Sequence, residues 1–222
     1  VIVNILVTGS DGFIAKNLIQ FLSEQNNINI LCFNRNSNED ELKEAVIKAD
    51  WIIHLAGVNR PLNEQEFVEG NITLTQKIAD LLKEHNKKTP IILSSSIQAE
   101  QDNAYGQSKL GGEQVLIDLN NNQGNPVYIC RLANVFGKWS RPNYNSAVAT
   151  FCHNIANDLP IQINNPDAVI RLVYIDDVVE TFWQMIEGHY SPEQYFVIEP
   201  EYQITVGGLA DTLREFKQSR DT

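Results

Sequence analysis

The chain has 222 residues, of which 43% are apolar and 20% are charged, the balance of a globular protein with one substantial core. Its formal charge of −11 argues against a nucleic-acid partner, and no apolar run approaches the ~20 residues that span a bilayer. The first residues lack a basic leader, so we expect a cytoplasmic protein with no membrane partner. Three cysteines without CxxC spacing and four scattered histidines predict reduced thiols and no metal site.

Over the first 135 residues, strand-like apolar runs alternate with amphipathic helical patterns. The expected strands are residues 2–7, 28–33, 51–55, 90–93 (running into the serines at 94–96) and 127–132. The expected helices run from the turn at 9–12 to about 24, and over 39–48, 71–85 and 105–119. This alternation predicts an α/β fold with a doubly wound, Rossmann-type parallel sheet.

After residue 136 the alternation becomes less regular. We expect a loop at 141–145, a helix ending near 157, short strands around 161 and 169, a helix over 177–187, a strand at 195–198 and a helix over 206–217. A helix cap is the better interpretation of the acidic pair Asp176-Asp177 than a metal site. The pattern predicts one domain over 1–222, with a core of about 1–135 and a small C-terminal substrate-binding lobe of about 136–222.

A glycine turn separates the first strand from the first helix. Gly9 permits a tight turn, and Gly12 lets the backbone approach a pyrophosphate. The amides of Asp11, Phe13 and Ile14 would then point at the phosphates from the positive end of the helix. A purely structural turn is the alternative, because many loops need glycine. The strand–turn–helix context favours a dinucleotide site.

The end of the second strand bears on which dinucleotide binds. An NAD site usually has a carboxylate there for the ribose 2′-hydroxyl, whereas this sequence has none before Glu39. Arg35 can instead hold a 2′-phosphate, with hydrogen bonds from Asn34 or Ser37. A solvated loop arginine is the alternative. We predict NADP(H) rather than NAD as the cofactor.

Tyr105 and Lys109 lie four residues apart, on one face of the helix after the fourth strand. A phenol has an ordinary pKa of ~10, and a nearby ammonium would favour its ionised form. A chance surface pair is the alternative. The position of the pair just beyond three serines favours a catalytic acid–base pair, in which Lys109 lowers the pKa of Tyr105 and orients the cofactor ribose.

Six motifs resemble the extended short-chain dehydrogenase/reductase superfamily. They are TGSDGFI at 8–14, HLAG at 54–57, SSS at 94–96, YGQSK at 105–109, RLANVFG at 131–137 and YIDDV at 174–178. The resemblance implies that Ser96, or failing it Ser95, holds the substrate oxygen beside Tyr105, and that Asn134 faces the substrate. It implies a cofactor contact from Leu55, Ala56 and Gly57. It also implies a homodimer formed through the helices at 71–85 and 105–119.

One branch of this superfamily is more similar still, the bacterial capsule and O-antigen reductases of UDP-N-acetyl-L-fucosamine synthesis. The likeness lies in residues 56–61, 94–99, 136–139, 142–146, 150–152 and 216–220. It implies NADPH-dependent reduction of the C4 ketone of a UDP-linked 2-acetamido-2,6-dideoxy-4-hexulose. In that branch a C-terminal cupin domain performs a metal-dependent epimerisation. Such a domain could follow residue 222, and its activity is not assigned to these residues.

Departures from the superfamily pattern narrow the chemistry. Ile97 and Gln98 stand where dehydratases place an acidic pair, which disfavours dehydration. The arginine that often holds the nucleotide-sugar diphosphate aligns one position from Arg171, so Lys138, Arg141 and Asn145 are alternative substrate contacts. For Arg141 a solvated loop residue is equally reasonable.

Ketone reduction is therefore the main hypothesis, with Tyr105 protonating the developing alkoxide and Ser96 polarising the carbonyl. The alternatives are a nucleotide-sugar 4-epimerase with bound NAD and a non-catalytic NADP-sensing module.

Overall fold

The computed structural model describes residues 1–59, 61, 63, 65–144, 146–192 and 195–219. The predicted substrate contact Asn145 lies outside the described residues, as do Arg60 and Arg220 of the resemblance motifs. The chain forms two compact units. The first comprises Val1–Leu132 and Val179–Val197, and the second comprises Ala133–Val178 and Ile198–Thr222.

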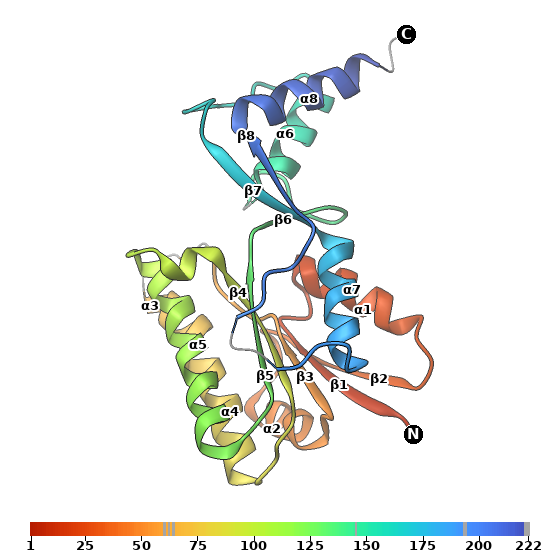
Figure 1. Cartoon of the computed structure of the whole chain (residues 1–222), viewed down its shortest axis with the longest axis vertical. Coiled ribbons are helices and arrows are strands. Elements are labelled where there is room, and N and C mark those ends of the chain that lie inside the picture. The colour runs from red at the N-terminus through yellow and green to blue at the C-terminus, as the bar shows by residue number, and fades with distance from the viewer. Residues whose placement is uncertain (60, 62, 64, 145, 193–194, 220–222) are drawn as a thin grey trace. The chain divides into compact units, whose positions relative to one another are not determined.

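A five-stranded parallel sheet forms the centre of the first unit (Figure 1). Its strands are β1 (Val3–Thr8), β2 (Ile28–Phe33), β3 (Trp51–His54), β4 (Ile91–Ser96) and β5 (Val127–Leu132), in the order β2-β1-β3-β4-β5. All neighbouring pairs are parallel. The strand order reverses between β1 and β3, which is where ligands bind in sheets of this kind. The predicted α/β fold with a doubly wound parallel sheet is confirmed.

One face of this sheet is covered by α2 (Glu39–Lys48), α4 (Leu74–Glu84) and α5 (Ala104–Gln123). Val46, Leu82 and Leu116 of these helices are fully buried against sheet residues such as Ile52 and Ile91. The opposite face is covered by α1 (Phe13–Ser23) and by the part of α7 (Ile175–Ile186) that follows Val178 (Figure 1). Strands β1, β3, β4 and β5 are therefore largely buried on both faces, which explains their mainly apolar sequences, whereas the edge strand β2 has Asn29 and Cys32 exposed.

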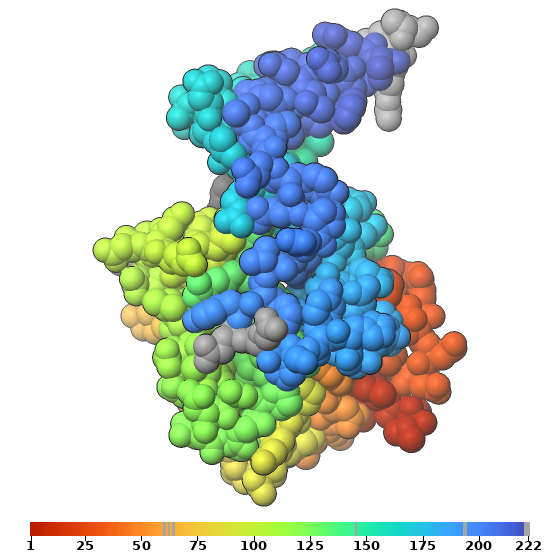
Figure 2. All heavy atoms as spheres, in the orientation of Figure 1, coloured from red at the N-terminus to blue at the C-terminus, as the bar shows by residue number. Residues whose placement is uncertain are grey.

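Helix α7 and the segment that follows it both pack on the first unit. Trp183 of α7 packs edge-on against Phe21 of α1, with 6.0 Å between the ring centroids, and Phe182 is fully buried. Phe196 then pairs with Cys130 of β5 in an isolated bridge. The strand expected at 195–198 is therefore reduced to one bridge. Figure 2 shows this segment, in blue, lying against the front of the first unit.

The helix expected at 71–85 begins earlier and is irregular. A short helix α3 (Gln65–Val68) is followed by a π-helical turn at Glu69–Thr73, and regular α-helix begins only at α4. π-Turns are uncommon and often occur at functional sites. This one carries Asn71, which is buried.

The second unit contains a three-stranded sheet in the order β6-β7-β8. Its strands are β6 (Asn134–Phe136), β7 (Val169–Tyr174) and β8 (Glu201–Thr205), with β6 and β7 parallel and β7 and β8 antiparallel. Helices α6 (Ala147–Ala156) and α8 (Val206–Gln218) enclose a small core around Phe151 and Leu209.

Three expectations for this unit need correction. Residue 161 lies in no strand, because Ile161 packs on the core of α6 and α8 instead of pairing with a neighbour. Helix α7 begins at Ile175, so Asp176 and Asp177 lie in its first turn rather than at a cap before residue 177. The chain also passes between the two units more often than a single boundary near residue 135 predicts. Among the described residues, no helix is both long and apolar enough to cross a membrane.

The return of α7 to the first unit can be tested with Phe182→Ala. We expect the free energy of unfolding to fall by about 3–5 kcal/mol, because a fully buried aromatic ring is removed. Phe216→Ala is the matched control, since that ring on α8 is 64% exposed, and its effect should stay within about 0.5 kcal/mol. Denaturant unfolding followed by circular dichroism measures both, and equal effects would contradict the assignment of Phe182 to the core.

Candidate active site

The carboxyl ends of β1 and β3 bring the glycine turn against the loop after β3. Gly9 has a φ of +65°, and a Cβ on it would lie 2.8 Å from the backbone nitrogen and Cα of Ala56. Both conditions require glycine. The amide of Gly12 donates to the carbonyl of Gly9 at 2.8 Å, which closes the turn directly before α1.

The amino end of α1 has no side-chain cap. Gly12 occupies the cap position without a side-chain hydrogen bond, and Asp11 and Gly12 are exposed. Phe13 and Ile14, which begin the helix, are half-buried. The first amides of a helix have no partner within the helix, so an uncapped and partly exposed amino end can donate to an anion. The turn therefore fits a pyrophosphate in both backbone space and hydrogen-bond donors.

The end of β2 forms a compact polar turn. The amide of Asn34 donates to Ser37 Oγ at 3.2 Å, and the amide of Asn36 donates to Asn34 Oδ1 at 2.9 Å. Arg35 is exposed, and the described residues give its guanidinium no ion-pair partner. The two polar side chains that flank Arg35 thus hold the turn in shape, while Arg35 is available for a ligand.

Ser96 and Tyr105 meet where β4 ends and α5 begins. The Ser96 hydroxyl lies close enough to the Tyr105 phenol to affect its pKa, and Ser96 Oγ accepts from the amide of Gln98 at 3.1 Å. Asn103 caps α5 by accepting from the amide of Gly106 at 2.8 Å. A Cβ on Gly106 would overlap the carbonyl oxygens of Gln98 and Gln101, so glycine there allows α5 to start close to the end of β4.

The pKa of Tyr105 lies above the ordinary value of a tyrosine. Burial raises this pKa, and the hydrogen bond from Ser96, which favours the phenolate, lowers it by less. This direction corrects the lowering by Lys109 that the spacing predicts. The ammonium is 6.0 Å from the centre of the ring, and desolvation of the phenol has the larger effect.

Strand alternation separates the two serines considered for the substrate oxygen. Ser95 lies on the same face of β4 as Ile91 and Leu93, which pack in the core beneath α5. Its hydroxyl donates to the buried carboxylate of Glu113. The structure therefore brings Ser96 rather than Ser95 to Tyr105.

Lys109 is half-buried beside the loop after β3. Its Nζ donates to the carbonyl of Ser94 at 3.2 Å, and a Cβ on Gly57 would lie 3.0 Å from this Nζ. Burial lowers the pKa of Lys109 to about 8, although the nearby Glu113 carboxylate acts in the opposite direction. Leu55 and Ala56 of the same loop are half-buried, and Gly57 is exposed.

Asn71 is a site residue that the sequence reasoning missed. Its Nδ2 donates to Ser108 Oγ at 2.9 Å, and its Oδ1 accepts from the amide of Val58 at 3.0 Å. A Cβ on Gly57 would lie 2.8 Å from this Oδ1, so Asn71 and Lys109 share the space beside Gly57. A polar residue on the inward face of the expected helix at 71–85 was the available signal.

Phe67 of α3 was also missed. Its ring contacts that of Tyr105, with 5.7 Å between the centroids, and so contributes to the burial of the phenol.

The predicted substrate residues Asn134, Lys138 and Arg141 each have a partner within the second unit. Asn134 Nδ2 donates to the carbonyl of Arg171 at 2.9 Å. Arg171 in turn forms a two-pronged ion pair with Glu201, at 2.6 and 2.8 Å. Lys138 lies 3.5 Å from the carboxylate of Asp176. The guanidinium of Arg141 lies 5.7 Å from the ring centre of Tyr144. Among the described residues, no group of three or more His, Cys, Asp or Glu side chains could hold a metal ion.

Residues 5–198 match the sequence model of the NAD dependent epimerase/dehydratase family. The chain belongs to this family. A reductase from Pseudomonas aeruginosa, named UDP-2-acetamido-2,6-beta-L-arabino-hexul-4-ose reductase, is 52% identical over 97% of the chain. The crystal structure of the capsular polysaccharide assembling protein CapF from Staphylococcus aureus superposes with a TM-score of 0.87 at 44% identity over 98% of the chain. The chain spans 58% of the length of each of these two relatives.

The fold is also found in more distantly similar solved structures. A UDP-glucuronic acid 4-epimerase from Bacillus cereus, solved with NAD, superposes with a TM-score of 0.86 at 20% identity. The match covers 97% of this chain and 84% of the epimerase. At that level of identity the likeness establishes the shared fold alone.

The pKa of Lys109 gives a pH-dependent contribution to stability. Between about pH 8 and its ordinary pKa of 10.5, the unfolded chain binds a proton at Lys109 that the folded chain does not bind, so the free energy of unfolding rises with pH. Relative to Lys109→Met, the wild type should therefore gain about 3 kcal/mol between pH 7.5 and 11. Denaturant unfolding across this range measures the difference.

Lys83→Met, at an exposed position on α4, controls for the loss of a lysine side chain. A difference between the wild type and Lys109→Met that is constant with pH would contradict the lowered pKa.

Proposed function

We propose that this protein is an NADPH-dependent oxidoreductase. It reduces the C4 ketone of a UDP-linked 2-acetamido-2,6-dideoxy-4-hexulose, a precursor of capsule or O-antigen sugars. The observation that carries the proposal is the grouping of the Ser96 hydroxyl beside the Tyr105 phenol, with Lys109 one helical turn away. The 52% identity to a reductase with a UDP-hexulose in its name supports the substrate class.

Tyr105 is suited to give a proton. Because burial raises its pKa, the phenol stays protonated at neutral pH and can protonate an alkoxide that develops on the substrate. Ser96 is already within hydrogen-bond reach of the phenol, so one substrate oxygen can contact both hydroxyls. Ser96 then polarises the carbonyl by donating to it.

Lys109 has two proposed tasks. Its ammonium, held by the carbonyl of Ser94, lies on the side of Gly57 and can contact the cofactor ribose. As proton transfer from Tyr105 begins, the same positive charge favours the phenolate that forms.

The cofactor is assigned to the carboxyl edge of the first sheet. The turn from Gly9 to Ile14 would hold the pyrophosphate, and Leu55, Ala56 and Gly57 would line the nicotinamide riboside. When bound, the reduced nicotinamide supplies the hydride. Arg35 at the end of β2 would hold the 2′-phosphate of NADPH, with Asn34 and Ser37 fixing the turn that presents it.

The second unit is assigned to the UDP-sugar. Asn134, Lys138 and Arg141, which are all exposed, are the proposed contacts. Incubation with NADPH and isomers of UDP-4-keto-6-deoxy-N-acetylhexosamine, followed by NMR of the product, identifies the sugar. Failure to oxidise NADPH with every isomer would contradict the proposed reaction.

Tyr105→Phe tests the proton donor. We expect kcat to fall by about 10²–10⁴-fold, the usual contribution of a general acid, because the ring is kept and only the hydroxyl is lost. The Kd for NADPH, measured by fluorescence titration, should change by less than about twofold, since uniform binding is retained. Tyr202→Phe on β8, where the ring is 51% exposed, is the matched control. Wild-type kcat in Tyr105→Phe would exclude this mechanism.

Arg35→Ala tests the choice of cofactor. Loss of charge-assisted hydrogen bonds to a 2′-phosphate should weaken NADPH binding by about 10–100-fold and leave NADH binding nearly unchanged. Titration with both cofactors gives the ratio of Kd values, and Arg214→Ala on α8 is the control for loss of an arginine. Equal weakening of both cofactors would show that Arg35 does not read the 2′-phosphate.

A further inference from the structure

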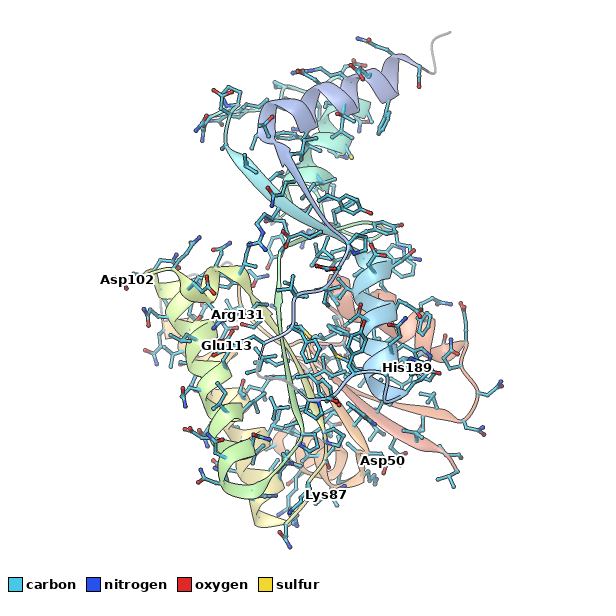
Figure 3. All side chains as sticks on the ribbon, viewed as in Figure 1. Asp50, Lys87, Asp102, Glu113, Arg131 and His189 are labelled. Atoms are coloured by element: carbon cyan, nitrogen blue, oxygen red, sulfur yellow. The ribbon has the colours of Figure 1, made fainter. Side chains whose placement is uncertain are left out.

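Glu113 is a fully buried carboxylate that the reaction outlined above does not use. It lies on α5 one helical turn beyond Lys109, and it accepts hydrogen bonds from three donors on two neighbouring strands. Ser95 Oγ of β4 donates to Oε1, Arg131 Nε of β5 donates to Oε1 at 3.0 Å, and Arg131 Nη2 donates to Oε2 at 2.6 Å. Figure 3 shows Glu113 and Arg131 lying together between α5 and β5.

These contacts join β4 and α5, which carry Ser96, Tyr105 and Lys109, to the neighbouring strand β5. Ser95 precedes Ser96 on β4, and it is the register partner of Arg131 on β5. Arg131 is further held by Glu100 at 2.9 Å and by the ring of Tyr195, whose centre is 4.0 Å from the guanidinium carbon. One side chain of α5 is thus bound to the ends of both strands at the level of the active site.

A buried ion pair is weak evidence for stability, because desolvation of two charges offsets most of their attraction. A hydrophobic residue would fill the same space between α5 and the sheet, as it does at Leu116 one turn along. The carboxylate therefore calls for a role beyond packing. Residues four apart on a helix have Cβ atoms ~6 Å apart, and the Glu113 carboxylate acts on the Lys109 ammonium as a nearby negative charge.

We propose that Glu113 is a positioning residue for the reaction: it fixes α5 against the ends of β4 and β5, and it places a negative charge one helical turn from Lys109. This proposal rests on the proposed function. In the absence of Glu113, Tyr105 would lose its fixed distance to Ser96, and Lys109 would lose the carboxylate that favours its protonated form.

The groups around Lys109 allow this charge effect to be isolated. On β3, His54 is held between Thr8 and Thr75, and its pKa is lowered to about 3 by burial and by Lys109, so it is neutral over the working pH range. On α5 the neighbours are Tyr105 and Glu113. On β5 the charged group is Arg131, whose guanidinium is bound to the Glu113 carboxylate. Asn71 of the π-turn and the Ser94 carbonyl of β4 carry no charge.

Glu113→Gln is the central variant, since it keeps the shape of the side chain and removes the charge. With NADPH and the UDP-hexulose, kcat should fall by about tenfold or more while KM changes by less than about threefold, because the acid–base geometry is disturbed rather than substrate binding. Glu100→Gln, which removes only the exposed partner of Arg131, should retain wild-type kcat. Wild-type kcat in Glu113→Gln, or an equal loss in Glu100→Gln, would overturn the proposal.

A second readout needs no turnover. The free energy of unfolding of a parent protein, taken relative to its Lys109→Met variant, changes with pH around the pKa of Lys109. The midpoint of this change should lie about one pH unit lower when the parent is Glu113→Gln than when the parent is the wild type. Glu113→Asp, which keeps the charge, should leave the midpoint near that of the wild type. An equal midpoint in Gln and Asp backgrounds would overturn the charge effect. If the wild type itself turns over no keto-sugar, the proposed function fails while this midpoint still tests Glu113.

Glu113→Gln removes the buried negative charge that pairs with Arg131, and this loss can prevent folding. Ser95→Ala and Glu113→Asp then carry the test, because both keep the carboxylate charge and alter only its fit. Each should lower kcat by about three- to tenfold, as misplacement of catalytic groups does. Wild-type kcat in both variants would overturn the positioning role.

Discussion

The parallel pairing of β1, β3, β4 and β5 places the carboxyl ends of these strands along one edge of the first sheet. In such a sheet each strand end is followed by a loop at the same edge, so residues distant in sequence meet there. The glycine turn follows β1, Leu55–Gly57 follows β3, and Ser96 ends β4. Helix α5 then returns from that edge with Tyr105 and Lys109 in its first turns. Reversing any one strand would remove its loop from the site.

Close backbone approach is the second requirement of this edge. Gly9 lies against Ala56, Gly57 leaves room for Lys109 and Asn71, and a Cβ on Gly112 would lie 2.7 Å from the carbonyl of Asn71. Glycine at these positions lets polar side chains from separate elements share a space too small for additional carbon atoms. Lys109, which is half-buried, and Glu113, which is fully buried, lie one turn apart on α5, and the Glu113 carboxylate favours the protonated form of Lys109.

The sequence predicted those parts of the fold that depend on local patterns. The bounds of β2 and α2 agree residue for residue, because five of the six residues of β2 are apolar and Asn38 and Glu41 form a capping box. Strands β6 and β8 were not expected, since one has three residues and the other is largely polar and exposed. The π-turn at Glu69–Thr73 depends on Asn71 bonding to Val58 and Ser108, which are distant contacts that periodicity does not encode.

For the candidate site, the spacing of residues in the sequence predicted which side chains lie together, but it did not predict the direction of their pKa shifts. Tyr105 and Lys109 share a helix face as their separation requires, whereas the raised pKa of the phenol depends on burial, including its contact with Phe67. The choice between Ser95 and Ser96 follows from strand alternation once β4 is known to extend to residue 96. Glu113 and Arg131 are 18 residues apart in sequence, and only the pairing of β4 with β5 under α5 brings them together.

The division of the chain also bears on how such a protein can diversify. The path leaves the first unit after Leu132, returns after Val178 and leaves again after Val197. No single recombination joint can therefore exchange the second unit as a block, and a fragment ending at Leu132 would lack Phe182 and the bridge at Phe196. With this topology, the second unit changes most readily during evolution by point substitutions and short loop insertions. Such changes leave the hydrophobic core of the first unit unaltered.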